Sequence, residues 1–276
     1  MTNQGNADVG KWEGTEAAAW NGVWEATPPA VIEALGMSHD EHPSLTIFRA
    51  ANVPSWFFNR MLVRPGVELP RPLLDAEIDR FVASGVQFGA CVPPATSAEL
   101  PRWLNARGLV HTTTLARMIT TTERLPSPAG GVEIRQVGRE HAAAFGEIAT
   151  RGFGMPPACP PWFARLPTRE GWRAYLAYVG GEPVATGALY IHGTVGWLGF
   201  GSTLDEHRGH GIHRAMLLRR MADAADLGCR WLQTETNHAQ GDEPTPSLDN
   251  MKRVGFQMAY TRDNYVLTPT ATPVAR

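Results

Sequence analysis

Residues 203–213 read TLDEHRGHGIH, and they carry the strongest structural signal in the chain. An extended, apolar segment runs into this turn, and the turn leads directly into a stretch with helical periodicity. Gly209 and Gly211 allow positive φ angles and let the backbone approach a ligand closely. The first N–H groups of a helix have no partner within the helix and carry partial positive charge. With the permanent charge of Arg208 beside them, they predict a site for phosphate or pyrophosphate.

The spacing of the glycines excludes two common phosphate-binding motifs. The turn follows an expected meander of three strands, and it has neither G-x-G-x-x-G spacing nor a Lys-[Ser/Thr] ending. A Rossmann dinucleotide site and a P-loop therefore do not fit. A tight strand-to-helix turn without any ligand is the alternative interpretation.

The surrounding segments predict a mixed sheet with helices on its faces. Apolar and alternating runs predict strands at residues 132–137, 172–179, 183–191, 195–204, 230–236 and 259–267. Apolar residues at spacings of three and four predict helices at residues 140–151, 161–165 and 211–227, and a short one from residue 247. Gly180 and Gly181 predict a hairpin turn. The expected order is β-α-(α)-β-β-β-α-β-α-β-β, which ends in two strands.

A polar segment rich in proline and glycine, residues 120–131 (TTTERLPSPAGG), separates two nearly equal halves. Both halves end with a short helix, a glycine that caps it and an extended segment, at residues 100–120 and 247–267. The capping glycines are Gly108 and Gly255. This similarity predicts an internal repeat, although junctions of this kind are common and a chance likeness is the alternative.

The first half lacks the Arg-Gly-x-Gly turn of the second. Its apolar runs predict strands at residues 45–48, 57–63 and 86–92, and its periodicity predicts a helix at 75–84. Trp20 and Trp24 are expected in a core. We therefore predict one domain at residues 1–125 and a second domain, with the phosphate turn, at residues 126–276.

The composition argues against several classes of protein. A formal net charge of −2, from 25 basic and 27 acidic residues, argues against a nucleic-acid partner. The three cysteines include no close pair, which argues against a disulfide framework and a four-thiolate zinc site. The polar start predicts no signal peptide, and the lack of a run of about 18 apolar residues predicts no membrane helix. We therefore expect a cytoplasmic protein.

Two motifs resemble the signatures of the GNAT superfamily of acyl-CoA-dependent N-acyltransferases. Residues 208–213 (RGHGIH) are similar to the Arg/Gln-x-x-Gly-x-Gly/Ala signature, although His213 replaces its last small residue. His213 is then either a helix-face residue or a phosphate contact. Residues 247–256 (SLDNMKRVGF) are similar to the second signature, a Ser or Ala followed by a helix and Gly-Phe. The resemblance covers about residues 130–268.

The resemblance implies a mixed α/β fold of α+β type, built from two tandem GNAT-like domains. Each domain would be a mixed, mostly antiparallel sheet flanked by helices. The N-terminal half would be a degenerate copy that has lost its CoA loop. An unrelated α/β cap is the alternative for that half.

The resemblance also implies how acetyl-CoA, or another acyl-CoA, would bind. Backbone N–H groups of the glycine turn would hold the pyrophosphate, and the strand before it would pair with the pantetheine amides. The family's sheet opens between this strand and the next, and thioester and amine meet in that slot. The implied binding residues are Ser202, Thr203, Leu204, Arg208, Gly209, His210, Gly211, Ile212, His213 and Asn237. His210 is expected at the solvent-exposed tip of the turn, and no metal is expected.

Attack of an amine on a thioester requires a neutral amine, so a base or a chain of waters must remove a proton. Glu235 is the first candidate base because it lies on the strand beside the expected slot. His192 and Glu170 are the next candidates. A solvated or ion-paired strand carboxylate is the alternative interpretation of Glu235.

The leaving thiolate needs a proton, which many family members supply from a Tyr four residues before the Gly-Phe glycine. Met251 stands at that position, so the usual acid is missing. Ser247, Tyr260 or Tyr265 would replace it, or the thiolate would leave unprotonated. Glu235 and Ser247 are thus the predicted catalytic residues.

The sequence therefore predicts an N-acyltransferase that uses acetyl-CoA or another acyl-CoA and acts on the amine of a small molecule, as a monomer or homodimer. Two alternatives stay open. In the first alternative the acyl donor is a carrier-protein thioester or an aminoacyl-tRNA, since His213 and Met251 depart from the family pattern. Alternatively, the protein would be a CoA-binding sensor without catalysis.

Overall fold

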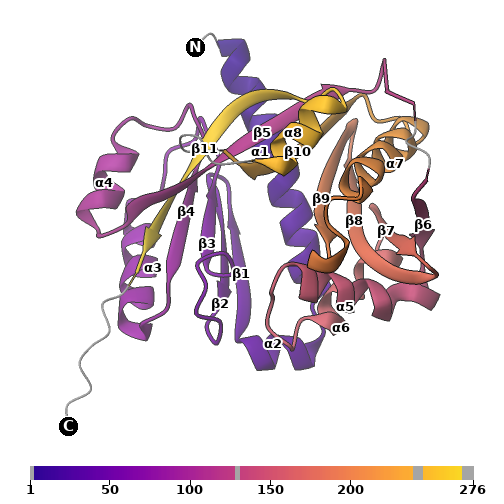
Figure 1. Cartoon of the computed structure of the whole chain (residues 1–276). Helices are drawn as coiled ribbons and strands as arrows, with labels where there is room; N and C mark the ends of the chain where they lie inside the picture. Colours follow the sequence, from indigo (N-terminus) through magenta and orange to yellow (C-terminus); the bar gives the residue numbers. More distant parts are fainter. Residues whose placement is uncertain (1–2, 128–130, 239–244, 269–276) are drawn as a thin grey trace. The chain divides into compact units, whose positions relative to one another are not determined.

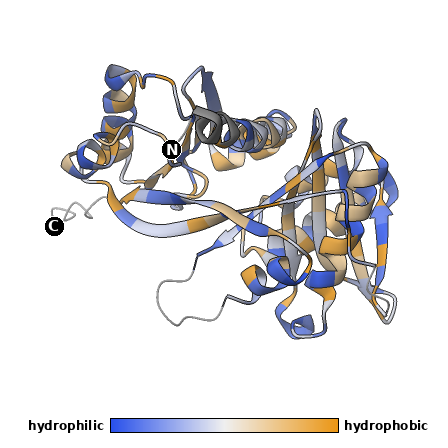
Figure 2. Ribbon diagram, turned by 90° about the horizontal axis from the view of Figure 1, so that it is seen from above, coloured by the Kyte–Doolittle hydropathy of each residue, from blue (hydrophilic) through white to orange (hydrophobic). Residues whose placement is uncertain are grey.

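The computed structural model describes residues 3–127, 131–238 and 245–268, with side chains from residue 9 onward (Figure 1). The chain divides into two compact units. Unit 1 comprises Met1–Ala17, Ile32–Leu115 and Thr261–Arg276, and unit 2 comprises Ala18–Val31 and Ala116–Tyr260, each as far as its residues are described. Each unit has a hydrophobic core of its own. In Figure 2, hydrophobic residues (orange) occur in strands and helices of both units.

Unit 1 is a mixed sheet flanked by helices. Its elements, in whole or in part, are α1 (Asn3–Glu25), α2 (Pro29–Leu35), β1 (Met37–His42), β2 (Leu45–Ala50), β3 (Arg60–Val63), α3 (Arg71–Ser84), β4 (Phe88–Val92), α4 (Leu100–Ala106), β5 (Val110–Thr121) and β11 (Gln257–Leu267). The strand order is β1-β2-β3-β4-β11-β5. β3 and β4 are parallel, whereas β1–β2, β2–β3 and β4–β11 are antiparallel.

Helix α3 covers the sheet of unit 1 through apolar side chains one helical turn apart. Ile78 and Phe81 are buried, and the Phe81 ring stacks on Phe88 of β4 with 4.4 Å between centroids. Strands β2 and β4 are buried along their whole length, as expected for strands that are covered on both faces.

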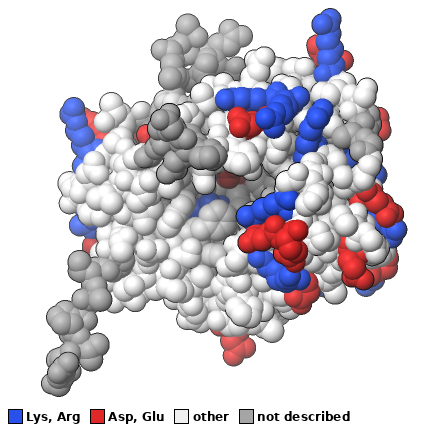
Figure 3. Space-filling model, viewed as in Figure 1, with Lys and Arg blue, Asp and Glu red and all other residues white. Residues whose placement is uncertain are grey.

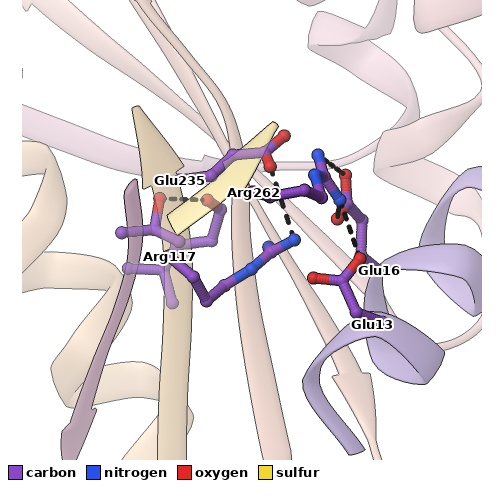
Figure 4. Close-up of polar contacts among 7 residues, drawn as sticks. Glu13, Glu16, Arg117, Glu235 and Arg262 are labelled. Atoms are coloured by element: carbon purple, nitrogen blue, oxygen red, sulfur yellow. Dashed lines mark hydrogen bonds and ion pairs between the residues drawn. The ribbon is translucent and has the colours of Figure 1, made fainter. Parts of the chain in front are cut away.

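A buried ion cluster joins β11 to α1 within unit 1. Arg262 Nη1 lies 2.9 Å from Glu13 Oε2 and also pairs with Glu16, and all three side chains are almost fully buried (Figure 4). Because a buried charge needs compensation, these three residues depend on one another.

Unit 2 also consists of mixed β-structure flanked by helices. Its further elements are β6 (Glu133–Val137), α5 (Ala142–Gly152), α6 (Pro160–Phe163), β7 (Trp172–Val179), β8 (Glu182–His192), β9 (Val195–Thr203), α7 (Ile212–Asp226), β10 (Trp231–Asn237) and α8 (Pro246–Arg253). The strand order is β5-β10-β9-β8-β7-β6. Strands β6 to β9 form an antiparallel meander, and β9 and β10 are parallel. Helix α7 packs on β8 and β9 through Met216, Leu217 and Met221.

The predicted turns form where glycine is required. Gly180 and Gly181 have φ angles of +60° and +88° and connect β7 to β8, which confirms the predicted hairpin. Gly108 follows α4 with φ +85°, and Gly255 follows α8 with φ +99°. Both halves therefore do end with a helix, a left-handed glycine and a strand, as the repeat predicts.

Strands β5 and β11 each contribute residues to both units. Residues 116–121 of β5 belong to unit 2 and residues 110–115 to unit 1, and β11 is likewise divided between residues 260 and 261. In unit 1, Tyr265 of β11 pairs with Ala90 of β4. In the strand order β11 lies between β4 and β5, so the C-terminal strand of the chain is inserted between two strands of the first half.

The predicted fold class, mixed α/β with sheets flanked by helices, is confirmed, but three details were wrong. The described residues contain one strand after α8, namely β11, and not two. The strand expected from Phe57 begins only at Arg60, because the Asn59 side chain holds a turn there, accepting from Ala50 N (2.7 Å) and donating to Val53 O (2.8 Å). Helix α1 was not predicted at all.

The segment 120–131 begins inside β5, and its residues 128–130 lie outside the described residues. The domain boundary at 125/126 stays a prediction.

Candidate active site

The glycine turn before α7 has the geometry of an anion site. Gly209 and Gly211 adopt φ angles of +83° and +76°, and a Cβ at either position would meet nothing within 4 Å. No side chain caps the helix at Gly211, and the first helical hydrogen bond runs from Ala215 N to Gly211 O (3.0 Å). The first N–H groups of α7 therefore have no acceptor within the helix and adjoin an exposed turn. This arrangement suits a phosphate or pyrophosphate group.

Arg208 and His210 both lie at the exposed surface of this turn. Arg208 Nη2 is 2.7 Å from Asp205 Oδ1, and its Nε donates to Thr203 O at 3.3 Å. The guanidinium thus braces the turn in this structure. His210 is exposed, as the sequence predicts.

Ile212 and His213 occupy the first turn of α7 differently. The Ile212 side chain is in the core, so its contribution to a ligand would be its N–H group. Burial lowers the pKa of His213 to about 4, and the nearby Arg220 adds to this effect. His213 is therefore neutral at pH 7. Its Nδ1 lies 3.3 Å from Asn250 Nδ2 on α8, so Nδ1 is the acceptor of that bond.

Strands β9 and β10 separate beyond a short paired segment. Their ladder runs from Val195↔Trp231 to Trp197↔Gln233, although β9 continues to Thr203 and β10 to Asn237. At the point of separation, the Thr234 hydroxyl donates to Leu198 O at 2.8 Å. The sheet of unit 2 therefore opens between these two strands, where the resemblance implies a slot.

The opened part of β9 contains the residues predicted to meet pantetheine. Ser202 and Thr203 are half-buried and pair with β8 on their other side. Leu204 differs, because its N–H donates to Val184 O (3.0 Å) and its carbonyl accepts from His207 N (2.9 Å). Ser202 and Thr203 are thus better placed than Leu204 to pair with a ligand.

A β-bulge bends β9 at the opening. Thr186↔Ser202 and Ala188↔Gly199 are successive pairs in the β8–β9 ladder, so β9 has one extra residue between them. Phe200, within the bulge, has φ +50°, which is unusual for a residue with a side chain. Its carbonyl accepts from the Thr186 hydroxyl at 2.9 Å. The N–H of Gly201, at the other end of the same trans peptide, therefore points away from β8.

Glu235 lies on β10 beyond the paired segment and is bound by an arginine. Its Oε2 lies 3.5 Å from Arg117 Nη2 on β5, and Arg117 is almost fully buried (Figure 4). The carboxylate is thus on the strand that lines the opening, with a fixed cation beside it. Both interpretations from the sequence, a base and an ion-paired strand residue, agree with this position.

The other two candidate bases lie elsewhere. His192 is exposed at the turn between β8 and β9, and it pairs with Val195 at the start of β9. The bulge begins several residues further along β9, and Ser202 lies roughly 23 Å along the strand from Val195 at about 3.3 Å per residue. Glu170 is exposed just before β7. The structure does not bring His192 to the opening.

The candidates for the acid are spread over two units. Ser247 is exposed in the first turn of α8, and Met251, at the position of the usual Tyr, is buried in the core of unit 2. Tyr260 is half-buried at the end of unit 2. Tyr265 belongs to unit 1, where burial raises the pKa of its hydroxyl. Asn237, at the end of β10, is exposed.

Sequence reasoning missed two buried arginines, Arg117 and Arg220. Arg220 lies on the apolar face of α7, three and four residues from Leu217 and Met216, and Arg117 lies between Ala116 and Met118 in β5. A charged residue inside an apolar stripe was the signal that could have found them.

Comparison with known proteins agrees with this geometry. Residues 133–239 match the family model described as the acetyltransferase (GNAT) domain. Residues 133–239 therefore belong to the GNAT superfamily of acyltransferases, and the predicted resemblance is confirmed. No curated protein sequence matches the chain.

Solved structures share the fold over both halves. A GCN5-related N-acetyltransferase from Kribbella flavida is 19% identical with a TM-score of 0.58, covering 87% of this chain and 93% of its own. One from Sphaerobacter thermophilus is 18% identical with a TM-score of 0.61, covering 82% and 81%. A tandem GNAT protein from the clavulanic acid biosynthesis pathway is 16% identical with a TM-score of 0.55, covering 83% and 79%. The tandem GNAT arrangement predicted from the sequence is therefore confirmed as a fold.

Of the helices in the described ranges, none is long and apolar enough to cross a membrane. The described side chains also include no group of three or more His, Cys, Asp and Glu that could hold a metal ion.

Proposed function

We propose that the protein is an acetyl-CoA-dependent N-acetyltransferase that acylates the amine of a small molecule. The observation that carries the proposal is the position of the uncapped glycine turn of α7. It directly follows β9, the strand from which β10 separates. One end of this arrangement suits a pyrophosphate, and the opening beside it suits an extended arm that ends in a thioester.

The residues present fit the parts of acetyl-CoA. The N–H groups from Gly209 to His213 would hold the pyrophosphate, with Arg208 as a supporting charge. The backbone of Ser202 and Thr203 would pair with the pantetheine amides in place of a strand. Asn237, at the end of β10, would bind the pantetheine arm or the acyl carbonyl. Acetyl-CoA itself supplies the activated acyl group.

The bulge in β9 supplies the donor that the reaction needs. Negative charge develops on the thioester oxygen when the amine attacks, and a fixed N–H group lowers the energy of that charge. The Gly201 N–H points away from β8, because the carbonyl of the same peptide is held by Thr186. This N–H would therefore be available on the edge from which β10 has separated.

Proton transfer is assigned to Glu235 and Ser247. Glu235 would take a proton from the incoming ammonium, directly or through water, and Arg117 would keep its carboxylate in place. Ser247 would protonate the thiolate, since Met251 has no proton to give. Release of an unprotonated thiolate is the alternative to the second step.

Non-catalytic binding of CoA is the second candidate function. The burial of Met251 at the usual position of the acid and the ion pair of Glu235 favour it. A donor other than free CoA, either a carrier-protein thioester or an aminoacyl-tRNA, is a variant of the first proposal. On the face drawn in Figure 3, basic and acidic side chains lie beside one another, which does not favour tRNA.

Two experiments test the proposal. Calorimetry measures the binding of CoA and acetyl-CoA, and a second assay detects free thiol released from acetyl-CoA across a library of amines. Binding and thiol release support the acetyltransferase. Binding without thiol release supports the sensor, and no binding at high micromolar concentration removes both. Thiol release from a loaded carrier protein but not from acetyl-CoA favours the other donor. The proposal includes a cytoplasmic monomer or homodimer, which sedimentation can test for the oligomeric state.

A further inference from the structure

Arg220 is a charged residue in an unusual position. It lies on α7 and its side chain is almost fully buried, with 1% of the residue exposed. Burial lowers its pKa to about 10, so the guanidinium remains charged at neutral pH. Such burial is costly, because a charge loses its hydration and usually needs an opposite charge in return.

The partners of Arg220 are backbone carbonyls. Its Nη1 donates to Ala188 O at 3.1 Å and to Gly199 O at 3.0 Å, and its Nε donates to Met216 O at 3.1 Å. Ala188 and Gly199 form the last regular pair before the β9 bulge. The guanidinium therefore joins β8 to β9 at the place where their ladder breaks.

Two glycines make room for this guanidinium. A Cβ at Gly201 would lie 3.3 Å from Arg220 Nη2, and a Cβ at Gly187 would meet Met216 Cγ and Sδ at 2.8 Å and Arg220 Nε at 3.1 Å. Neither glycine has the positive φ that would otherwise explain its presence. Gly201 of β9 is thus matched to the buried arginine at position 220, and Gly187 of β8 is matched to both Met216 and Arg220.

The consequence for the bulge follows from the planarity of the peptide. The Gly199 carbonyl faces Arg220, so the Phe200 N–H, at the other end of the same trans peptide, points away from the guanidinium. A carbonyl that accepts a charged donor also polarises its own N–H group and makes it a stronger donor. The next peptide is held by Thr186, which orients the Gly201 N–H.

We propose that Arg220 is a positioning residue for acyl transfer, which holds the β9 bulge so that the Phe200 and Gly201 N–H groups face the thioester oxygen. This inference rests on the proposed function. It adds a residue that does not contact the substrate and acts through the backbone of β9.

The test compares Arg220→Met with Arg219→Met, the adjacent residue on α7, which is 38% exposed and pairs with Asp223. We expect Arg220→Met to bind CoA within threefold of the unmodified protein in calorimetry, because the glycine turn is unchanged. Its kcat with acetyl-CoA and an acceptor from the amine library should fall at least tenfold, with little change in KM. Arg220→Lys should recover part of kcat, and Arg219→Met should match the unmodified protein.

A readout that needs no acceptor accompanies these rates. In ¹⁵N–¹H spectra of the protein without ligand, the Phe200 and Gly201 amides should shift in Arg220→Met and not in Arg219→Met. If Arg220→Met does not fold, Gly201→Ala serves instead, since its Cβ would press on the guanidinium and should lower kcat while CoA binding persists.

The outcomes separate the two proposals. If the unmodified protein fails to bind acetyl-CoA, the proposed function is wrong and the role of Arg220 falls with it. If the unmodified protein transfers acetyl groups and Arg220→Met has the same kcat, only the role of Arg220 is wrong. A fall in melting temperature with unchanged kcat and unchanged amide shifts also overturns it, because Arg220 would then be structural alone.

Discussion

The glycine turn of α7 allows a quantitative test with the double variant Arg208→Ala/Gly211→Val. Gly211 has φ +76° and a Cβ there would meet nothing within 4 Å, so valine would suffer from backbone strain and not from a clash. The left-handed conformation costs an L-residue about 1–2 kcal/mol, and more for a β-branched one. The turn would relieve this strain by rotating, which moves the first N–H groups of α7.

The loss in affinity follows from the bonds that would be misdirected. A hydrogen bond to a charged group contributes about 1.5–3 kcal/mol, and the loss of one such bond exceeds a factor of ten in Kd. We therefore expect CoA to bind at least tenfold more weakly in calorimetry at constant salt. The matched control is Gly66→Val, which has the same strain (φ +78°) in an exposed turn of unit 1. Unchanged CoA affinity in the double variant would refute the assignment of the pyrophosphate to this turn.

Three further predictions concern the base, the half-buried His213 and the core of unit 2. Glu235→Gln should lower kcat about a hundredfold while CoA still binds, because the amide cannot take a proton but still fits beside Arg117; an unchanged kcat in the thiol-release assay would assign that step to water. His213 has a folded pKa of about 4 against 6.5 for the free side chain, so its neutral form is favoured by folding. Its contribution to stability is complete above pH 6.5 and is lost as the pH falls toward 4, by at most about 3 kcal/mol. Urea unfolding at pH 6.5 and 4.5 should show this loss, His213→Gln should reduce it, and an equal pH dependence of both proteins would contradict it. Trp162→Phe removes the 2.7 Å hydrogen bond to Val23 O in a buried site and should lower the free energy of unfolding by about 1–3 kcal/mol in urea; a smaller change than 0.5 kcal/mol would show that this bond is replaced.

The features that were predicted correctly from the sequence are specified by residues that lie close together in the chain. Two of these features are local patterns, namely the hairpin at Gly180 and Gly181 and the periodic face of α7. The turn before α7 is also local, because its positive φ angles favour glycine. Local signals of this kind survive in a single sequence, because the residues that specify the structure lie within one turn or one helix.

Helix α1 shows why a local pattern can fail. Its first 22 residues include four glycines, which lower helix propensity, so the segment has no strong helical signal. Trp12, Trp20 and Trp24 are nevertheless buried along it, and this packing stabilises the helix. Tertiary contacts therefore decide its structure, and they are not visible in the segment alone.

The missed parts of the site have the same cause. The partner of Glu235 is Arg117, which lies 118 positions earlier in the chain. The bulge in β9 depends on register with β8 and on Arg220 from α7. Glu235 could be chosen from the sequence as a strand carboxylate, but its environment could not, because it comes from another strand.

The pairing of β11 with β4 has a consequence for how the chain is synthesised. Strand β4 ends at Val92, whereas the part of β11 that pairs with it begins at Asp263. At about 5–20 residues per second, a ribosome needs roughly 10–30 s to make the intervening chain. During that interval a fully buried strand of the finished protein has an uncovered edge, which is a known route to aggregation. The N-terminal half, which carries no phosphate turn, therefore cannot finish folding before β11 has been synthesised, and binding by chaperones would matter most in that period.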